Sequence, residues 1–342
     1  MSRPGPMKGD GEPAGFIGLG QMGKPMATRL TAWPGGLIVY DTRPEAMAPL
    51  ADAGAKAAGS VAEVAAAAGI ISVMVRDDGQ VREVVRAVAA AARGRPVIAA
   101  IHATIGPGTA AELAGEVSHT GVEVVDAPVS GGFMGAQDGR LAVMVGGSRA
   151  AYERCREPFG CWADLIMHMG PVGAGTRAKL ARNLLHFAAF TAAAEAQRLA
   201  EAAGVDLRKL GLVVRHSDAV TGGAGAIMLR PTTAPLDTDD PLREILEHVR
   251  ALGEKDLSLA LDLGAELGVD LPMARLALGS FAAGLAWTGA SAALTRWPRS
   301  TAGRSRTAPA TSSASPWTTC SPRSGPGRAC PCGTAGCCCS AC

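Results

Sequence analysis

The C-terminal segment of this chain lacks most of the residue types that form protein cores and ion pairs. Residues 287–342 contain no Asp, Glu, Lys, His, Ile, Val, Met, Phe or Tyr. Such a segment cannot bury enough apolar surface to offset the entropy of ordering it. We therefore expect residues 287–342 to be a low-complexity tail that is either disordered or translated from a shifted reading frame.

Cysteine is scarce outside this segment. Only Cys155 and Cys161 of the nine cysteines precede residue 300, which excludes the disulfide framework of a small secreted domain. The other seven lie near the end of the chain, where one residue separates Cys330 from Cys332 and no histidine follows. This spacing differs from the paired C-x-x-C of zinc sites. A metal-binding or redox tail and a genuine disordered extension remain the alternatives.

The chain also lacks an excess of charge of either sign. Its 33 Lys and Arg against 31 Asp and Glu leave a net charge of +2, which argues against a nucleic-acid binder. The six arginines of residues 287–342 have no acidic counterpart there, so the rest of the chain is mildly acidic.

No apolar run is long enough to cross a membrane. The longest weakly polar stretch, residues 61–75, is interrupted by Glu63 and Gly69 and falls short of the roughly 20 residues that a spanning helix needs. Residues 1–13 lack the apolar segment of a secretion signal, so we expect a flexible leader there. These features predict a cytoplasmic protein that does not bind membranes.

Strand-like and helix-like segments alternate through the first half of the chain. Expected strands cover residues 14–17, 37–40, 70–75, 97–101 and 122–125, and expected helices cover 22–32, 61–68, 81–92 and 107–117, with a further helix starting near 43. Alternation of this kind is typical of βαβ units. It predicts an α/β Rossmann domain over residues 14–172, with a doubly wound parallel sheet and helices on both faces.

Residues after 172 show helical patterns only. Residues 176–203 contain neither Pro nor Gly, which predicts one helix roughly 42 Å long. Further helices are expected at residues 207–217, 241–252, 256–267 and 271–283. We expect an all-α C-terminal domain over residues 173–286, joined to the sheet by the long helix.

A glycine-rich turn follows the first expected strand. Gly18, Gly20 and Gly23 form G-x-G-x-x-G with Leu19, Gln21 and Met22 between them. In dinucleotide-binding folds the first glycine permits a tight turn, the second admits the pyrophosphate, and the third allows close packing of helix on strand. The turn thus predicts a dinucleotide cofactor.

Asp41 ends the second expected strand, where a carboxylate can accept hydrogen bonds from the adenosine ribose hydroxyls. We therefore favour NAD over NADP, with Thr42 and Arg43 also at the cofactor. Because Arg43 could offset the charge of a 2′-phosphate, NADP remains possible. Asp41 could also cap the helix that starts near Pro44.

Four sequence blocks resemble the β-hydroxyacid dehydrogenases, the 3-hydroxyisobutyrate dehydrogenase-like enzymes of the 6-phosphogluconate dehydrogenase superfamily. The blocks are GFIGLGQMGKPMA (15–27), DAPVSGG (126–132) with GAQDGRLAVMVGG (135–147), GPVGAGTRAKLARNLL (170–185) and KDLSLALDL (255–263). The resemblance implies an NAD(P)-dependent oxidoreductase that interconverts a short 3-hydroxy acid and its semialdehyde. It also implies a homodimer or homotetramer built through the helical domain.

The resemblance assigns two lysines to the active site. Lys179 matches the catalytic lysine, and burial beside a nicotinamide cation could lower its pKa enough for general acid/base catalysis. Asn183, one helical turn later, is expected to orient both Lys179 and the substrate. Lys255 matches the second lysine, which binds cofactor and substrate from the helical domain.

Further matches surround these lysines. Ser130, Gly131 and Gly132 resemble the loop that binds the substrate carboxylate, and Thr104 matches a threonine near the nicotinamide ribose. The pocket walls are expected to include Phe133 and Met134.

The chain departs from the family pattern at three positions. His102 and Ala103 stand where the family commonly has Asp and Ser, and Arg182 replaces a common Asn. We interpret His102 as structural rather than as a second acid or base. The histidines lack the spacing of metal sites, and hydride transfer needs no metal.

Three alternatives stay open. The chain could be a semialdehyde or glyoxylate reductase that uses NADPH. It could also be related to the imine reductases, although these usually carry Asp or Tyr in place of Lys179. From a different class, it could be a non-catalytic dinucleotide-binding protein with an impaired C-terminal domain.

Overall fold

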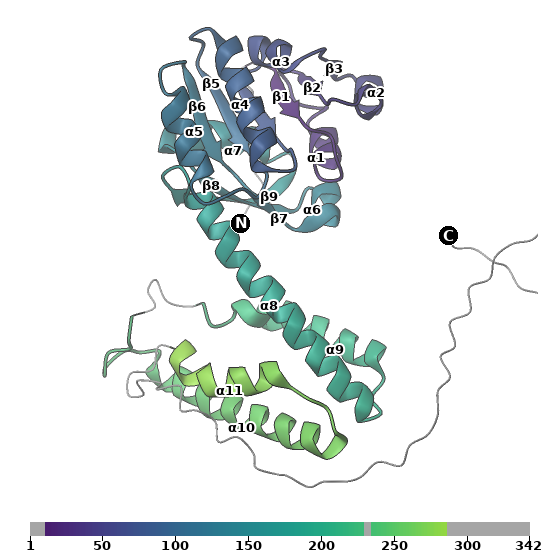
Figure 1. Cartoon of the computed structure of the whole chain (residues 1–342), viewed down its shortest axis with the longest axis vertical. Coiled ribbons are helices and arrows are strands. Elements are labelled where there is room, and N and C mark those ends of the chain that lie inside the picture. The colour runs from purple at the N-terminus through teal and green to yellow at the C-terminus, as the bar shows by residue number, and fades with distance from the viewer. Residues whose placement is uncertain (1–10, 229–233, 286–342) are drawn as a thin grey trace, which may run out of the picture. The chain divides into compact units, whose positions relative to one another are not determined.

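A computed structural model of the chain describes residues 11–228 and 234–285 (Figure 1). The expected leader and tail therefore lie largely outside the described residues. Within the described part, nine strands form one sheet in the order β3-β2-β1-β4-β5-β6-β8-β7, with β9 paired to β8. The strands are β1 (Ala14–Ile17), β2 (Leu37–Tyr40), β3 (Lys56–Ala57), β4 (Ile70–Val73), β5 (Val97–Ile101), β6 (Val122–Asp126), β7 (Val129–Ser130), β8 (Leu141–Gly146) and β9 (Ala163–Gly170).

The sheet is parallel from β3 to β6, as the alternating pattern predicted. The strand order reverses between β1 and β4, which is the topological switch point where doubly wound sheets bind ligands. Beyond β6, where no strand was expected from the sequence, the sheet is mixed. There β8 runs antiparallel to β6 and β7, because the helical segment between β7 and β8 reverses the chain direction without a full crossover.

Helices cover both faces of the sheet. These are α1 (Gly23–Arg29), α2 (Pro44–Asp52), α3 (Val61–Ala67), α4 (Asp78–Ala92), α5 (Thr109–Val117), α6 (Gly132–Asp138) and α7 (Arg149–Phe159). One buried cluster joins the sheet to α3, α4 and α5, and a second joins it to α1, α2, α6 and α7. Ser60 caps α3, since its side chain accepts a hydrogen bond from the Glu63 N–H.

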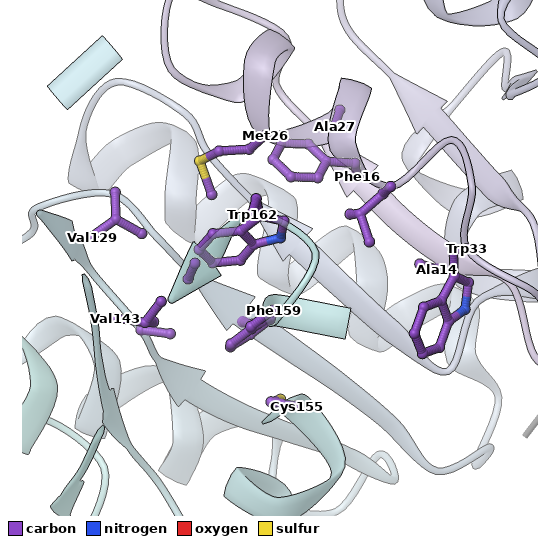
Figure 2. Close-up of a cluster of buried hydrophobic side chains, with 14 of the residues drawn as sticks. Ala14, Phe16, Met26, Ala27, Trp33, Val129, Val143, Cys155, Phe159 and Trp162 are labelled. Carbon is purple, nitrogen blue, oxygen red and sulfur yellow. The ribbon is translucent and has the colours of Figure 1, made fainter. Parts of the chain in front are cut away.

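The second cluster contains the large aromatic residues of the domain. Phe159 ends α7 and Trp162 follows it, and both side chains are fully buried with their ring centroids 5.0 Å apart. Figure 2 shows them among residues of β1, α1 and β8, including Phe16, Met26 and Val143. Burial of this size favours folding by several kcal/mol (about 25 cal/mol per Å² of apolar surface).

The C-terminal half of the described chain consists of helices (Figure 1). They are α8 (Ala174–Ala202), α9 (Leu207–Thr221), α10 (Arg243–Leu267), α11 (Pro272–Gly284) and a single 3₁₀ turn, η1 (Gly223–Gly225). The long helix α8 packs on β6, β8 and β9 and also contacts α9, α10 and α11. Among the described residues, no helix has the length and apolar composition to span a bilayer.

One helix boundary was predicted wrongly. The sequence indicated two helices separated near Gly253, but α10 runs through this position without interruption. A Cβ added at residue 253 would collide with the Cε1 and lie 2.5 Å from the Cζ of the Phe281 ring. Atoms in contact do not approach this closely, so only glycine fits here. Glycine therefore lets α11 approach α10 here, and tertiary packing outweighs its poor helix propensity.

Candidate active site

The glycine-rich turn is shaped for a group outside the chain. Gly18 has φ +93°, and a Cβ there would collide with the carbonyl of Met74, which directly follows β4. A Cβ at Gly23 would collide with the Gly18 carbonyl, so this glycine permits close packing of α1 on β1. Gly20 has an ordinary φ and open space above it, so the chain's own packing does not require a glycine there. An open second glycine fits the close approach of a dinucleotide pyrophosphate.

Asp41 connects this turn to the end of β2. Its Oδ2 accepts a hydrogen bond from the Leu19 N–H at 2.7 Å, and its Oδ1 accepts from the N–H and Nε of Arg43 at 2.9 and 3.2 Å. Burial by itself raises the pKa of Asp41, but these hydrogen bonds and the Arg43 charge bring the pKa below its usual 3.8. The carboxylate is thus ionised at neutral pH. No side chain caps α2, whose N-cap residue is Arg43.

The loop after β5 contains Thr104, which is exposed. Asp78 at the start of α4 fixes this loop, because its carboxylate accepts hydrogen bonds from the Gly106 N–H at 3.0 Å and from the Thr109 hydroxyl. The sequence did not indicate this role for Asp78. Its position at the end of the β4–α4 loop was the available signal.

His102 lies inside the sheet, in agreement with its structural interpretation. Its Nδ1 lies 2.8 Å from the Ala127 carbonyl oxygen and its Nε2 lies 3.0 Å from the Ser72 Oγ. Because a carbonyl only accepts, Nδ1 carries the proton and Nε2 accepts from the Ser72 hydroxyl. Burial lowers the pKa of His102 from 6.5 to about 4, so the ring is neutral and links β4 and β5 to the segment after β6.

The segment after β6 presents a turn with exposed backbone. Ser130 ends β7, and the exposed residues Gly131 and Gly132 follow with φ +130° and +64°. An added Cβ at Gly131 would press on the Leu141 side chain at 3.0 Å, so both space and backbone conformation favour glycine. Phe133 and Met134 continue into α6 with their side chains exposed.

Asp126 holds the start of α8 against this segment. It ends β6, is fully buried, and its carboxylate oxygens accept hydrogen bonds from the N–H groups of Gly173 and Thr176, both at 2.6 Å. Burial raises the pKa of Asp126, and the two N–H groups oppose this effect. Asp126 begins the DAPVSGG block (126–132), but the sequence indicated no role for it. An acid at the carboxyl end of a buried strand was the signal that could have revealed it, and Asp41 lies at the corresponding place directly after β2.

Lys179 lies one turn after this anchor. The residue is only 9% exposed, which is unusual for lysine. Burial first, and then the positive charge of Arg182, lower the pKa of Lys179 from its ordinary 10.5. Asn183 lies one turn further along α8, and its Oδ1 accepts a hydrogen bond from the Arg182 guanidinium at 3.3 Å.

Lys255 belongs to the helical half of the chain. It is exposed on α10, and its Nζ lies 3.2 Å from an Asp256 carboxylate oxygen. Helix α10 packs against α8 and α11.

The remaining candidate residues meet at one edge of the sheet. The glycine-rich turn, Asp41 and Thr104 follow the carboxyl ends of β1, β2 and β5, and Ser130 follows β6. Parallel strands expose their carboxyl ends at the same edge, where α/β proteins bind ligands. Asp126 adds the start of α8, and hence Lys179, to this edge.

Two family models match the chain in tandem. The NAD binding domain of 6-phosphogluconate dehydrogenase matches residues 13–170. The NAD-binding domain of NADP-dependent 3-hydroxyisobutyrate dehydrogenase matches residues 173–297.

Individual proteins extend this similarity. An uncharacterized oxidoreductase of Mycobacterium tuberculosis is 59% identical over 273 residues, which cover 79% of this chain and 92% of that protein. A crystal structure described as an oxidoreductase from Mycobacterium avium is 56% identical with a TM-score of 0.77, covering 80% of this chain and 98% of the other. The structure of Mycobacterium tuberculosis 3-hydroxyisobutyrate dehydrogenase with L-serine is 32% identical with a TM-score of 0.56. The match covers 80% of this chain and 95% of that protein.

An imine reductase from a Pseudomonas species shares the fold alone, at 19% identity and a TM-score of 0.63 over 80% of this chain and 95% of its own. The tandem family models and the similarity over most of the chain confirm the resemblance that the motifs indicated. This chain belongs to the 3-hydroxyisobutyrate dehydrogenase-like family of NAD(P)-dependent hydroxyacid dehydrogenases.

Proposed function

We propose that this protein interconverts a short 3-hydroxy acid, similar to 3-hydroxyisobutyrate, and its semialdehyde, with Lys179 as the general acid/base. The observation that carries the proposal is the burial of Lys179 on α8. Asp126 holds the start of this helix by hydrogen bonds, next to the strand end that leads to Ser130. NAD(P), when bound, accepts or donates the hydride. A buried lysine with a lowered pKa takes the hydroxyl proton during oxidation and returns it during reduction.

The other residues bind and orient the reactants. In this proposal Ser130, Gly131 and Gly132 hold the substrate carboxylate through a hydroxyl and unhindered N–H groups. Asn183 orients the substrate beside Lys179, and Lys255 binds cofactor and substrate from the helical domain. The domains are residues 14–172 for the cofactor and 173–286 for substrate and assembly.

The cofactor is held by residues that follow β1, β2 and β5. They are Gly18, Leu19, Gly20, Gln21, Met22, Gly23, Asp41, Thr42, Arg43 and Thr104. We favour NAD because the ionised Asp41 would repel the 2′-phosphate of NADP. The guanidinium of Arg43 is already engaged by Asp41, which limits its ability to offset that repulsion.

The test of this proposal is the variant Lys179→Ala. Loss of a general acid/base lowers kcat by about 10²–10⁴-fold, while cofactor affinity, measured by NADH fluorescence, stays unchanged. Lys209→Ala, at an exposed position on α9, is the matched control and keeps wild-type turnover. A Lys179→Ala variant with wild-type kcat would overturn the assignment.

The substrates for this test are 3-hydroxyisobutyrate, glyoxylate, succinic semialdehyde, tartronate semialdehyde and methylmalonate semialdehyde, each with NAD(H) and NADP(H). A clear preference for glyoxylate or a semialdehyde with NADPH favours the reductase alternative. Cofactor binding without turnover of any of these compounds favours the non-catalytic alternative.

We also propose that the helical domain assembles into a homodimer or homotetramer. Its own buried core among the described residues is small, with Leu236, Leu246 and Leu285 as buried members. Large apolar side chains are exposed along α8 and α9, including Leu184, Phe187, Phe190, Leu212 and Val213. Apolar surface of this extent is typical of a subunit interface.

A further inference from the structure

The loop between β5 and α5 presents one exposed residue from an otherwise buried stretch. Within residues 102–105, Thr104 is exposed, whereas its neighbours are buried, namely His102, Ala103 and Ile105. The two hydrogen bonds of the His102 ring fix the start of this loop. Because the residues on both sides of Thr104 are packed inside the domain, the path of the loop determines where the Thr104 side chain points.

Asp78, the first residue of α4, fixes the other end of the loop. Its two carboxylate oxygens lie 3.0 and 3.2 Å from the Gly106 nitrogen, which donates to them, and one of them also accepts from the Thr109 hydroxyl. Arg82, one turn further along α4, donates to the Thr109 oxygen at 3.4 Å. A hydroxyl that accepts from Arg82 directs its single proton to Asp78.

These contacts are charge-assisted, because Asp78 is ionised. The hydrogen bond from Thr109 is the largest effect on the pKa of Asp78, and together with the Gly106 N–H and the Arg82 charge it outweighs burial and lowers the pKa below its usual 3.8. Hydrogen bonds to an ionised acceptor are roughly twice as strong as neutral ones. The carboxylate therefore holds the loop more firmly than a neutral side chain would.

The order of the strands relates this loop to one half of a dinucleotide. The order β2-β1-β4-β5 puts the glycine-rich turn, which follows β1, between Asp41 on one side and Thr104 on the other. A dinucleotide with its adenosine ribose at Asp41 and its pyrophosphate at the turn extends its nicotinamide towards β4 and β5. Strand β5 lies two strand spacings, roughly 10 Å, from β1.

We propose that Asp78 is a positioning residue that orients the nicotinamide half of the cofactor by fixing the loop that bears Thr104. The inference rests on the proposed function, which assigns Thr104 to the cofactor. Asp78 does not touch the reactants and acts through Gly106 and Thr109. Hydride transfer needs the reacting atoms about 3–3.5 Å apart, and a displacement of about 1 Å can cost about 10²-fold in rate.

The experiment compares the binding of NADH with that of ADP-ribose, which lacks the nicotinamide. In Asp78→Ala we expect the Kd of NADH to rise by up to about tenfold, the effect of one lost hydrogen bond, while the Kd of ADP-ribose stays unchanged. Calorimetric titration measures both. We also expect kcat to fall by about tenfold or more, because the nicotinamide is no longer held in line with the substrate.

The neighbouring acid provides the matched control. Asp77 accepts a hydrogen bond from the Gln80 N–H and caps α4, and asparagine caps helices equally well. Asp77→Asn should therefore leave kcat and both Kd values unchanged. Thr109→Val removes one donor from Asp78 and should reproduce part of the NADH loss, even if Asp78→Ala does not fold. Thr109→Ser keeps the hydroxyl and should retain wild-type binding.

A double-mutant cycle tests whether Asp78 acts through Thr104. Thr104→Ala should itself weaken NADH binding and leave ADP-ribose binding unchanged. If Asp78 only positions this residue, Asp78→Ala should cause no further loss of NADH affinity in the Thr104→Ala background. Fully additive losses would overturn the route through Thr104, and so would wild-type NADH binding by Thr104→Ala.

The two ligands also separate this inference from the proposed function. Equal losses of NADH and ADP-ribose affinity in Asp78→Ala would overturn the inference, since Asp78 would then support the whole cofactor site or the fold. Wild-type NADH affinity and kcat in this variant would overturn it too. A wild-type protein that turns over no hydroxy acid or aldehyde, with a loss in Asp78→Ala confined to NADH, would contradict the proposed reaction and not the role of Asp78.

Discussion

The two lysines that the family motifs select lie in different surroundings. Lys179 is buried beside Arg182, whereas Lys255 is exposed and close to the Asp256 carboxylate. A lysine needs a lowered pKa to act as a base near neutral pH, and both burial and a like charge lower it. The local environment therefore supports Lys179, rather than Lys255, as the residue that exchanges protons.

The pH dependence of alcohol oxidation tests the contribution of Arg182. In the proposed reaction Lys179 must be neutral to accept the hydroxyl proton, so kcat/KM is expected to fall as the pH drops below its pKa. Because the Arg182 charge lowers that pKa, Arg182→Gln should move this limb of the pH profile to higher pH. Arg177→Gln, on the opposite helix face, should leave it in place. A shift to lower pH would show that Arg182 does not act on Lys179 through its charge.

His102 makes stability depend on pH. Its pKa is about 4 in the folded protein and 6.5 when unfolded, so the unfolded chain binds the proton first. The contribution of the neutral His102 ring to the free energy of unfolding is complete above pH 6.5. It falls by up to about 3 kcal/mol as the pH drops towards 4. His102→Asn should be less stable than wild type at pH 7, and the difference should shrink by this amount at pH 4.

Urea unfolding at several pH values measures the difference. His119→Asn, at an exposed position after α5, is the matched control. A constant gap between wild type and His102→Asn from pH 7 to pH 4 would mean that the folded protein protonates His102 as readily as the unfolded chain.

At the scale of elements, the contact between α8 and the sheet positions the site. Asp126 bonds the first turn of α8, and Gly175 lets that turn approach the sheet closely. A Cβ at residue 175 would collide with the Met144 carbonyl and lie 2.6 Å from the Asp126 carbonyl and 3.0 Å from the Gly146 nitrogen. These neighbours are all backbone atoms, which cannot move aside as a flexible side chain can.

Gly175→Ala should therefore displace α8 and destabilise the protein by about 1–3 kcal/mol, the usual range for overpacking. It should also reduce kcat, because Lys179 moves with the helix. The matched control is Gly115→Ala in α5, where an added Cβ meets nothing within 4 Å. That control should be neutral or stabilising by up to about 1 kcal/mol. Calorimetric unfolding and steady-state kinetics check both variants, and a Gly175→Ala protein with wild-type stability and kcat would contradict the close approach.

At the scale of the whole molecule, the two halves of the described chain differ in how they bury apolar residues. The sheet has extensive buried clusters on both faces, whereas α9 has no buried residue and the 29 residues of α8 include only four. Helices with so little burial gain little stability from their own packing. We expect a second copy of the chain to cover them.

Light scattering of the full-length protein should give a mass of two or four times 34.6 kDa. Phe190→Glu places a charge within the exposed apolar surface of α8 and should shift the protein towards monomer, with a lower Tm. Ala90→Glu adds the same charge at an exposed position on α4 and should leave the mass unchanged. A wild-type protein that is monomeric at micromolar concentration would refute this assembly.

Much of the fold could be predicted because its signals are local. Strands β1, β2 and β5 lie at their expected residues, since short apolar runs bounded by glycine or polar residues identify buried strands. The sequence did not predict the strands and helices between β7 and β9, because the strands there are short or mix buried and exposed residues. Helix α10 was divided wrongly at Gly253, where contact with Phe281 determines the residue type.

The amino-acid sequence by itself determined the order of strands and helices up to β6, the glycine-rich turn, and the motifs that identify the family. All of these depend on residues close together in the chain. Only the tertiary structure decided that Lys179 is buried, that His102 lies inside the sheet, and that Asp126 bonds residues 47 and 50 positions later. Desolvation and hydrogen bonding depend on which distant segments meet, so they appear only when β6 and α8 are packed together.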